Sequence, residues 1–167
     1  MGLDITAYRK LEATVPAGTA IDDVAAADMD DRFFVRAHHL AWVEATWPGR
    51  AEGLTTGLFR FAEAFSFGAG SYGGYNHWRD WLAHIAGFKS ADQVWEKKPQ
   101  GPFVELINFA DNEGFIGPVV SAKLAKDFAE HQAKVDALEL DEDYQRAYSN
   151  WRKAFEMAAD GGAIEFH

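Results

Sequence analysis

The residues best suited to chemistry lie in two glycine-rich loops, each placed directly before a helical pattern. The first loop covers residues 68–79, with the sequence GAGSYGGYNHWR. Its glycines would let the backbone approach a ligand, and the helix that follows would present unpaired N–H groups to an anion. Tyrosine rings can stack on a planar group, and arginine can supply charge to a phosphate or carboxylate. From this loop we expect ligand contacts by Ser71, Tyr72, Tyr75, Asn76 and Arg79.

The second loop covers residues 108–118, with the sequence NFADNEGFIGP. Its carboxylates could bind a hard cation, act as a general acid/base pair, or accept hydrogen bonds from ribose hydroxyls or a base edge. We expect it to lie beside the first loop and to contribute Asn108, Asp111, Asn112, Glu113 and Gly114 to one ligand site. The structural alternatives are that the first loop is only a tight connection, and that the acidic groups cap the next helix or pair with Arg79.

Neither loop carries a complete catalytic or metal-binding signature. The glycine spacing matches neither a phosphate-binding Walker loop nor a dinucleotide fingerprint, and the acidic spacing is not that of an EF-hand. The chain has no Cys, which excludes disulfides, thiolate zinc sites and cysteine nucleophiles. We expect His38 and His39 on opposite faces of an extended segment, and His77 and His84 lie too far apart for a zinc pair. We therefore assign no catalytic residue, no metal and no cofactor.

Composition limits the partners that the protein can have. The net charge of −10 argues against duplex nucleic acid and against an anionic membrane surface. It leaves room for a small phosphorylated ligand, because local N–H groups can outweigh distant charge. The chain has 6 Trp, 13 Phe and 5 Tyr; some of these rings must lie in the core, and the excess is compatible with a pocket that stacks planar ligands. Without a secretory pattern or an apolar run of about 20 residues, we expect a cytoplasmic protein.

Periodicity predicts an α+β fold in one domain spanning residues 1–167, with a mostly antiparallel sheet and about three packed helices. Helices are expected from an N-cap at Asn76 to Gly87, from Pro118 through Val135, and from Asp141 through Ala158. Alternation and β-branched or aromatic content predict strands. They are expected at residues 2–9, 33–36, 40–46 and 103–109, in a hairpin of 59–61 with 65–67, and at a sheet edge at 163–166. Trp47, in a Pro-Gly turn, could serve as a lid or interface residue.

Several blocks of the chain resemble a family of small proteins from phages, prophages and bacteria for which no activity is established. The blocks are MGLDI at the start, WPGRAEGL at 47–54, GAGSYGGYNHWR at 68–79, LINFADNEGFIGP at 106–118 and GGAIEFH at 161–167. The family pattern has Ser and Cys where this chain has Ala110 and Asn112, so Asp111, Glu113 and Gly114 are the matching loop residues. The resemblance implies a phage context and marks the two loops.

These observations favour a phage-type protein that binds a small anionic ligand without chemistry. A nucleotide-derived signal is the expected class, by analogy with phage proteins that sequester the second messengers of bacterial defence; the location would then be the host bacterial cytoplasm. One alternative is a hydrolase of a nucleotide-like ester that uses Asp111 and Glu113. A second alternative is an acidic inhibitor that binds a host protein. Exposed aromatic residues around Trp42 and Trp47 leave a homo-oligomer open.

Overall fold

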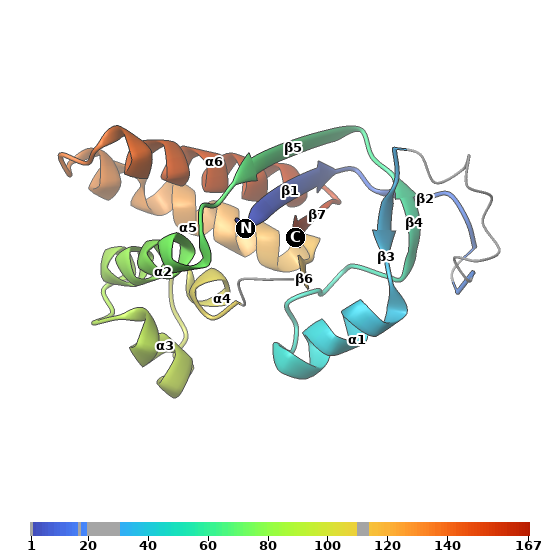
Figure 1. The fold of residues 1–167 in the computed structure, drawn as a ribbon, viewed down its shortest axis with the longest axis horizontal. Helices are drawn as coiled ribbons and strands as arrows, with labels where there is room; N and C mark the ends of the chain where they lie inside the picture. The colour runs from blue at the N-terminus through green and yellow to red at the C-terminus, as the bar shows by residue number, and fades with distance from the viewer. Residues whose placement is uncertain (1, 17, 20–30, 110–113) are drawn as a thin grey trace.

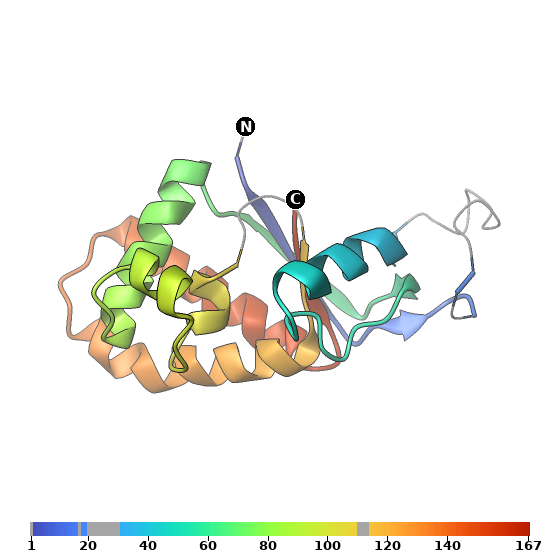
Figure 2. The ribbon, with the colours of Figure 1, turned by 90° about the horizontal axis from the view of Figure 1, so that it is seen from below.

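The computed structural model describes residues 2–16, 18–19, 31–109 and 114–167. A four-stranded sheet lies across the middle of the molecule, between a group of helices on one side and helix α1 with a smaller sheet on the other (Figures 1 and 2). The C-terminus of the chain lies close to the larger sheet (Figure 1). The candidate site described below lies where these two sides approach each other.

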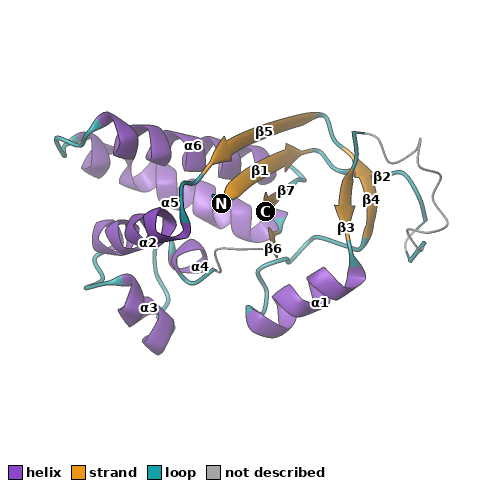
Figure 3. Cartoon of the chain, in the orientation of Figure 1, coloured by secondary structure: helices purple, strands orange, loops and turns teal. Residues whose placement is uncertain are grey.

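Both sheets are antiparallel at every pairing among the described residues (Figure 3). The larger sheet has the order β5-β1-β7-β6, with bounds Glu63–Gly68, Asp4–Arg9, Ala163–Phe166 and Gly114–Ile116. The smaller sheet has the order β2-β4-β3, with bounds Glu12–Ala13, Gly57–Arg60 and Phe33–Val35.

Six helices occur in the described part of the chain. Three are long: α2 (Tyr72–Ala86), α5 (Pro118–Asp136) and α6 (Glu142–Ala158). The other three are shorter: α1 (Ala37–Thr46), α3 (Ala91–Lys97) and α4 (Val104–Ile107). The long helices correspond to the three that the sequence predicts.

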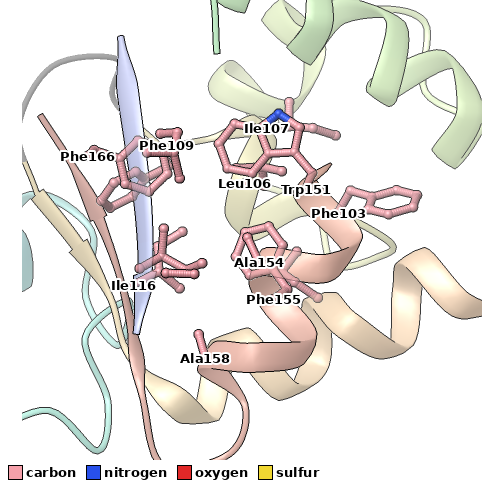
Figure 4. Packing of buried hydrophobic residues seen from close by; sticks show 14 of the residues in the cluster. Phe103, Leu106, Ile107, Phe109, Ile116, Trp151, Ala154, Phe155, Ala158 and Phe166 are labelled. Atoms are coloured by element: carbon pink, nitrogen blue, oxygen red, sulfur yellow. The ribbon is translucent and has the colours of Figure 1, made fainter. Parts of the chain in front are cut away.

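The core joins the larger sheet to α4 and α6. Phe109, Ile116 and Phe166 project from the sheet side toward Trp151 and Phe155 of α6 (Figure 4). Ring centroids of Phe109 and Phe166 lie 4.7 Å apart, and those of Trp151 and Phe166 lie 5.8 Å apart. Much of the aromatic excess is therefore core packing.

The α+β class and several elements are confirmed. Residues 4–9 form a strand with Leu3 and Ile5 both buried, as the alternation predicts. Helix α5 begins at Pro118, and α6 begins after an Asp141 cap whose carboxylate accepts a hydrogen bond from the Tyr144 N–H at 3.0 Å. Gly87 ends α2 in the left-handed conformation.

Other predictions are wrong. Residues 40–46 belong to helix α1, so His38 and His39 lie on a helix, with ring centroids 4.3 Å apart. Residues 104–107 form helix α4, and 114–116 form strand β6 instead of a loop. The expected hairpin does not exist, because β4 pairs with β2 and β3 while β5 pairs with β1. Strand β7 is central, and the cap of α2 is Ser71 instead of Asn76.

Candidate functional site

A cleft of about 650 Å³ lies between the turn that follows α1 and the segment that carries α4. Its size falls in the range of small-ligand pockets. One wall is residues 46–50, the other is residues 98–108, and α5 closes the floor with Lys123 and Asp127. Helices α1 and α4, which adjoin these walls, lie on opposite sides of the larger sheet (Figure 2).

The first wall is a turn held by a carboxylate. Glu44, in α1, accepts hydrogen bonds from the backbone N–H groups of Gly49 and Ala51, each at 3.0 Å. The Gly117 N–H donates to the Arg50 carbonyl at 2.8 Å, which ties the turn to the start of α5. A Cβ on Gly117 would lie 2.4 Å from the Glu52 carbonyl oxygen, so only glycine permits this approach. The backbone of Arg50 is therefore fixed from two directions.

Arg50 is a partly buried cation on this wall. Its Nε donates to the Glu105 carbonyl at 3.0 Å, whereas its two Nη groups have no hydrogen-bond or ion-pair partner among the described residues. Burial lowers the pKa of Arg50, and the carboxylates of Glu105 and Glu44 act in the opposite direction. Guanidinium remains charged at neutral pH, and its loss of hydration strengthens its attraction to an anion.

The floor of the cleft is an ion network centred on Lys123. Its ammonium group lies 2.6 Å from Glu105 Oε2, 2.7 Å from Asp127 Oδ2 and 2.6 Å from the Gly101 carbonyl oxygen. Asp127 is buried and also accepts from the Phe103 N–H at 2.8 Å. Both carboxylates, Glu105 and Asp127, are thus already paired with a cation. Two other charged residues line the cleft outside this network, namely Arg50 and the exposed Lys98.

Two further groups in the cleft suit a planar polar ligand. Trp47 is partly buried and packs on Phe109, with ring centroids 4.9 Å apart, while it also lines the cleft. Asn108, one of the predicted site residues, lines the cleft as well. The Asn108 amide has no hydrogen-bond partner among the described side chains and backbone groups. The face of an indole can stack on a planar ring of a ligand. A side-chain amide can both donate hydrogen bonds to polar atoms of that ring and accept hydrogen bonds from them.

Three of the residues predicted from the first loop meet behind the second wall: Tyr75 and Arg79, which are buried, and Asn76, which is exposed. Arg79 is 7% exposed and donates to the Asn76 side chain and to the carbonyls of Phe109 and Ile107. Its guanidinium lies 4.8 Å from the Tyr75 ring centroid and 4.9 Å from that of Trp95. This cluster fixes the backbone on both sides of Asn108, but Tyr75, Asn76 and Arg79 do not line the cleft.

The remaining predicted residues are spread over different places. The Ser71 hydroxyl caps α2 by accepting from the Gly74 N–H at 3.1 Å, and Tyr72 is 39% exposed. Gly114 opens β6, where an added Cβ would lie 3.0 Å from the Phe109 ring and 3.3 Å from Val43. Asp111, Asn112 and Glu113 lie outside the described residues.

Sequence reasoning missed Arg50 and assigned Trp47 only a lid or interface role. The available signal was the block at 47–54, which the resemblance marks and which combines a ring, a Pro-Gly turn and a cation. No local pattern links this turn to the facing wall, which lies more than 45 residues away in sequence.

Comparisons with protein families, curated proteins and solved structures found no match. Within the described ranges, no helix is both long and apolar enough to cross a membrane. Among these same residues, no group of three or more His, Asp or Glu side chains is arranged to hold a metal ion.

Proposed function

We propose that this protein binds a small anionic ligand of the nucleotide-derived class in the cleft beside Arg50, and holds it without chemistry. In the phage setting that the resemblance implies, such sequestration would keep a signal from its receptor and counter host defence. The observation that carries the proposal is the partly buried Arg50 guanidinium, whose Nη groups have no hydrogen-bond or ion-pair partner among the described residues.

Each part of such a ligand has a matching group in the cleft. A phosphate can accept two parallel hydrogen bonds from the Arg50 Nη groups, with Lys98 close by as a second cation. A base can stack on Trp47 and exchange hydrogen bonds with Asn108. Capture is favoured over hydrolysis by the cleft carboxylates because both Glu105 and Asp127 already form ion pairs with Lys123.

The test is calorimetric titration with a panel of mononucleotides, cyclic dinucleotides and the corresponding nucleosides. We expect binding of phosphorylated compounds and weaker or absent binding of the nucleosides. The variant Arg50→Met should lower the affinity by about 10- to 100-fold, because a hydrogen bond to a charged group contributes about 1.5–3 kcal/mol. Arg50→Lys keeps the positive charge but lacks the planar guanidinium, so its affinity should lie between those of the wild type and Arg50→Met.

Arg60→Met is the matched control. Arg60 is an exposed arginine on β4 that pairs with Glu12, so the same chemical change is made away from the cleft. Its affinity should equal that of the wild type. Equal affinities of wild type and Arg50→Met for every ligand that binds would place the site elsewhere.

A further inference from the structure

The two edges of the larger sheet differ in length and in exposure. One edge is strand β6, which has three residues, all of them buried. The other edge is β5, whose six residues pair only with β1 among the described strands (Figure 1). A strand with a free edge presents unpaired N–H and C=O groups, which can pair with another extended strand.

The direction of the backbone groups along β5 follows from the bonds of its neighbour β1. Asp4 of β1 exchanges hydrogen bonds with His167, after the end of β7, at N–H···O distances of 2.8 and 3.0 Å. Because successive residues of a strand point to opposite neighbours, Ile5 turns the other way and bonds to β5, where it faces Phe67. The same alternation along β5 directs the N–H and C=O groups of every second residue away from β1. These outward residues are Ala64, Ser66 and Gly68.

The features that usually protect an edge strand from pairing are missing along β5. Its sequence, EAFSFG, contains no Pro and no Lys, and its pairing with β1 continues without a bulge from Glu63 to Gly68. Its one charged residue is Glu63, at the first position, and Arg9 pairs with that carboxylate at 3.3 Å. The edge that follows Glu63 is therefore uncharged and regular.

The side chains of this edge are arranged symmetrically about Ser66. Small residues occupy positions 64 and 68, and phenylalanines occupy positions 65 and 67. In an antiparallel pair of two copies centred on Ser66, Phe65 of each copy would face Phe67 of the other. Ala64 would face Gly68 in the same way, so each side chain meets one of similar size.

This register also suits the charges and the aromatic rings. Glu63 would face Ala69 of the other copy, whereas a register centred on Phe65 would set the Glu63 carboxylate against Phe67. Phe65 and Phe67 are only partly buried, with ring centroids 5.7 Å apart. Cross-strand contacts would cover the exposed parts of both rings, and no charge would face a like charge along the paired segment.

We propose that two copies of this chain associate through β5, in antiparallel register about Ser66, so that the two larger sheets become one continuous sheet. The proposal is independent of the cleft beside Arg50, because no residue of β5 lines that cleft.

The test measures the molar mass of the purified protein by light scattering after size-exclusion chromatography, across a dilution series. The wild type at high concentration should have the mass of two chains. Ser66→Lys should raise the dissociation constant of the dimer by about tenfold or more, because two lysines would then face each other at its centre. Ala13→Lys is the matched control and should dissociate like the wild type, since Ala13 is an exposed residue of β2, an edge strand of the smaller sheet.

A cysteine variant tests the register. The chain has no Cys, so Ser66→Cys carries a single thiol. Facing residues of a hydrogen-bonded antiparallel pair have Cα atoms about 5.5 Å apart, within the range of about 4.4–6.8 Å that a disulfide spans. Mild oxidation should therefore link Ser66→Cys, but not Ala13→Cys, into a covalent dimer on a non-reducing gel. Thermal melting establishes that each variant is folded.

A wild type with the mass of one chain at every concentration would overturn the proposal and leave this edge to an extended segment of another protein. An unchanged dissociation constant in Ser66→Lys would overturn it as well, as would equal cross-linking of the two cysteine variants.

Discussion

Two arginines, Arg50 and Arg79, differ in what surrounds them, and this difference decides which of them can hold a ligand. The Arg79 guanidinium is enclosed by two rings and donates to three oxygens. Among the residues that the structure describes, Arg50 donates a hydrogen bond only through its Nε, and Arg50 lines the cleft. From sequence, Arg79 is the better candidate because it follows a glycine loop, but burial and hydrogen bonding assign it to support of the backbone around Asn108.

Replacing Arg79 tests whether this residue supports the backbone or contacts the ligand. Arg79→Met leaves the carbonyls of Ile107 and Phe109 without this donor, so we expect the free energy of unfolding in urea to fall by about 2–3 kcal/mol. Ligand affinity of the folded variant should stay within about threefold of the wild type, far from the loss caused by Arg50→Met. Normal stability combined with lost binding would mean that Arg79 contacts the ligand directly.

Glu165 predicts a pH dependence of stability. Burial raises the pKa of its carboxyl above the ordinary value of 4.5, although the Tyr8 hydroxyl donates to it at 2.9 Å and His167 and His39 lie nearby. The folded state therefore holds this proton more tightly than the unfolded state. The contribution of Glu165 to stability should fall as pH rises from about 4.5 through the raised folded pKa, and stay low above it.

Glu165→Gln removes this titration. Its free energy of unfolding, measured in urea across a series of pH values, should lack the decline that the wild type shows in that window. Identical pH profiles of the two proteins would show that Glu165 does not titrate differently on folding.

At the scale of helices and strands, the sequence predicts the elements in which buried residues recur at the regular spacing of that element. Helix α6 buries a regular stripe that includes Tyr148, Trp151 and Phe155. This helical pattern can be recognised from the sequence of the segment alone. Helix α1 buries only Val43, so it shows no stripe, and its aromatic and β-branched residues suggest a strand. Residues 103–109 are apolar almost throughout, which cannot distinguish a strand from a buried helix.

Strand pairing and the cleft depend on contacts that no local pattern encodes. β4 and β5 are adjacent in sequence yet belong to different sheets, because their partners lie more than 20 residues away. The same holds for Arg50 and Glu105, which meet across 55 residues. The sequence could therefore single out Asn108, which lines the cleft, but not the wall that faces it.

The junction of the 49–54 turn with α5 provides a prediction at this scale. Gly117→Ala would force a Cβ against the backbone of Ala51 and Glu52, so we expect a loss of about 2–3 kcal/mol of stability and weaker ligand binding as Arg50 is displaced. Gly49→Ala meets no atom within 4 Å, but its φ of +81° should still cost about 1 kcal/mol. Urea unfolding measures both, and a larger loss in Gly49→Ala would contradict this account of the junction.

At the scale of the whole molecule, the cleft concentrates positive charge on a protein of net charge −10. Its lining holds three cations, Arg50, Lys98 and Lys123, against the two carboxylates of Glu105 and Asp127. These groups come from distant segments and meet only in the folded chain. A ligand that bridges them binds the folded state alone and stabilises it.

This linkage predicts a rise in melting temperature. A ligand at about 100 times its Kd adds about 2.7 kcal/mol, which for a chain of this size corresponds to about 5–10 °C. Differential scanning fluorimetry should show this shift for the wild type and for Arg60→Met, and a much smaller one for Arg50→Met. Equal shifts in all three proteins would mean that the stabilising ligand lies outside the cleft.

The measurement that tests the central claim most directly is native mass spectrometry of wild type and Arg50→Met purified from phage-infected bacteria. Our account predicts that the wild type carries a phosphate-containing small molecule, released intact on denaturation, and that Arg50→Met has lost it. The same molecule on both proteins would contradict the assignment of Arg50. A wild-type protein that carries nothing and also binds no compound of the nucleotide panel would contradict capture of a nucleotide-derived ligand.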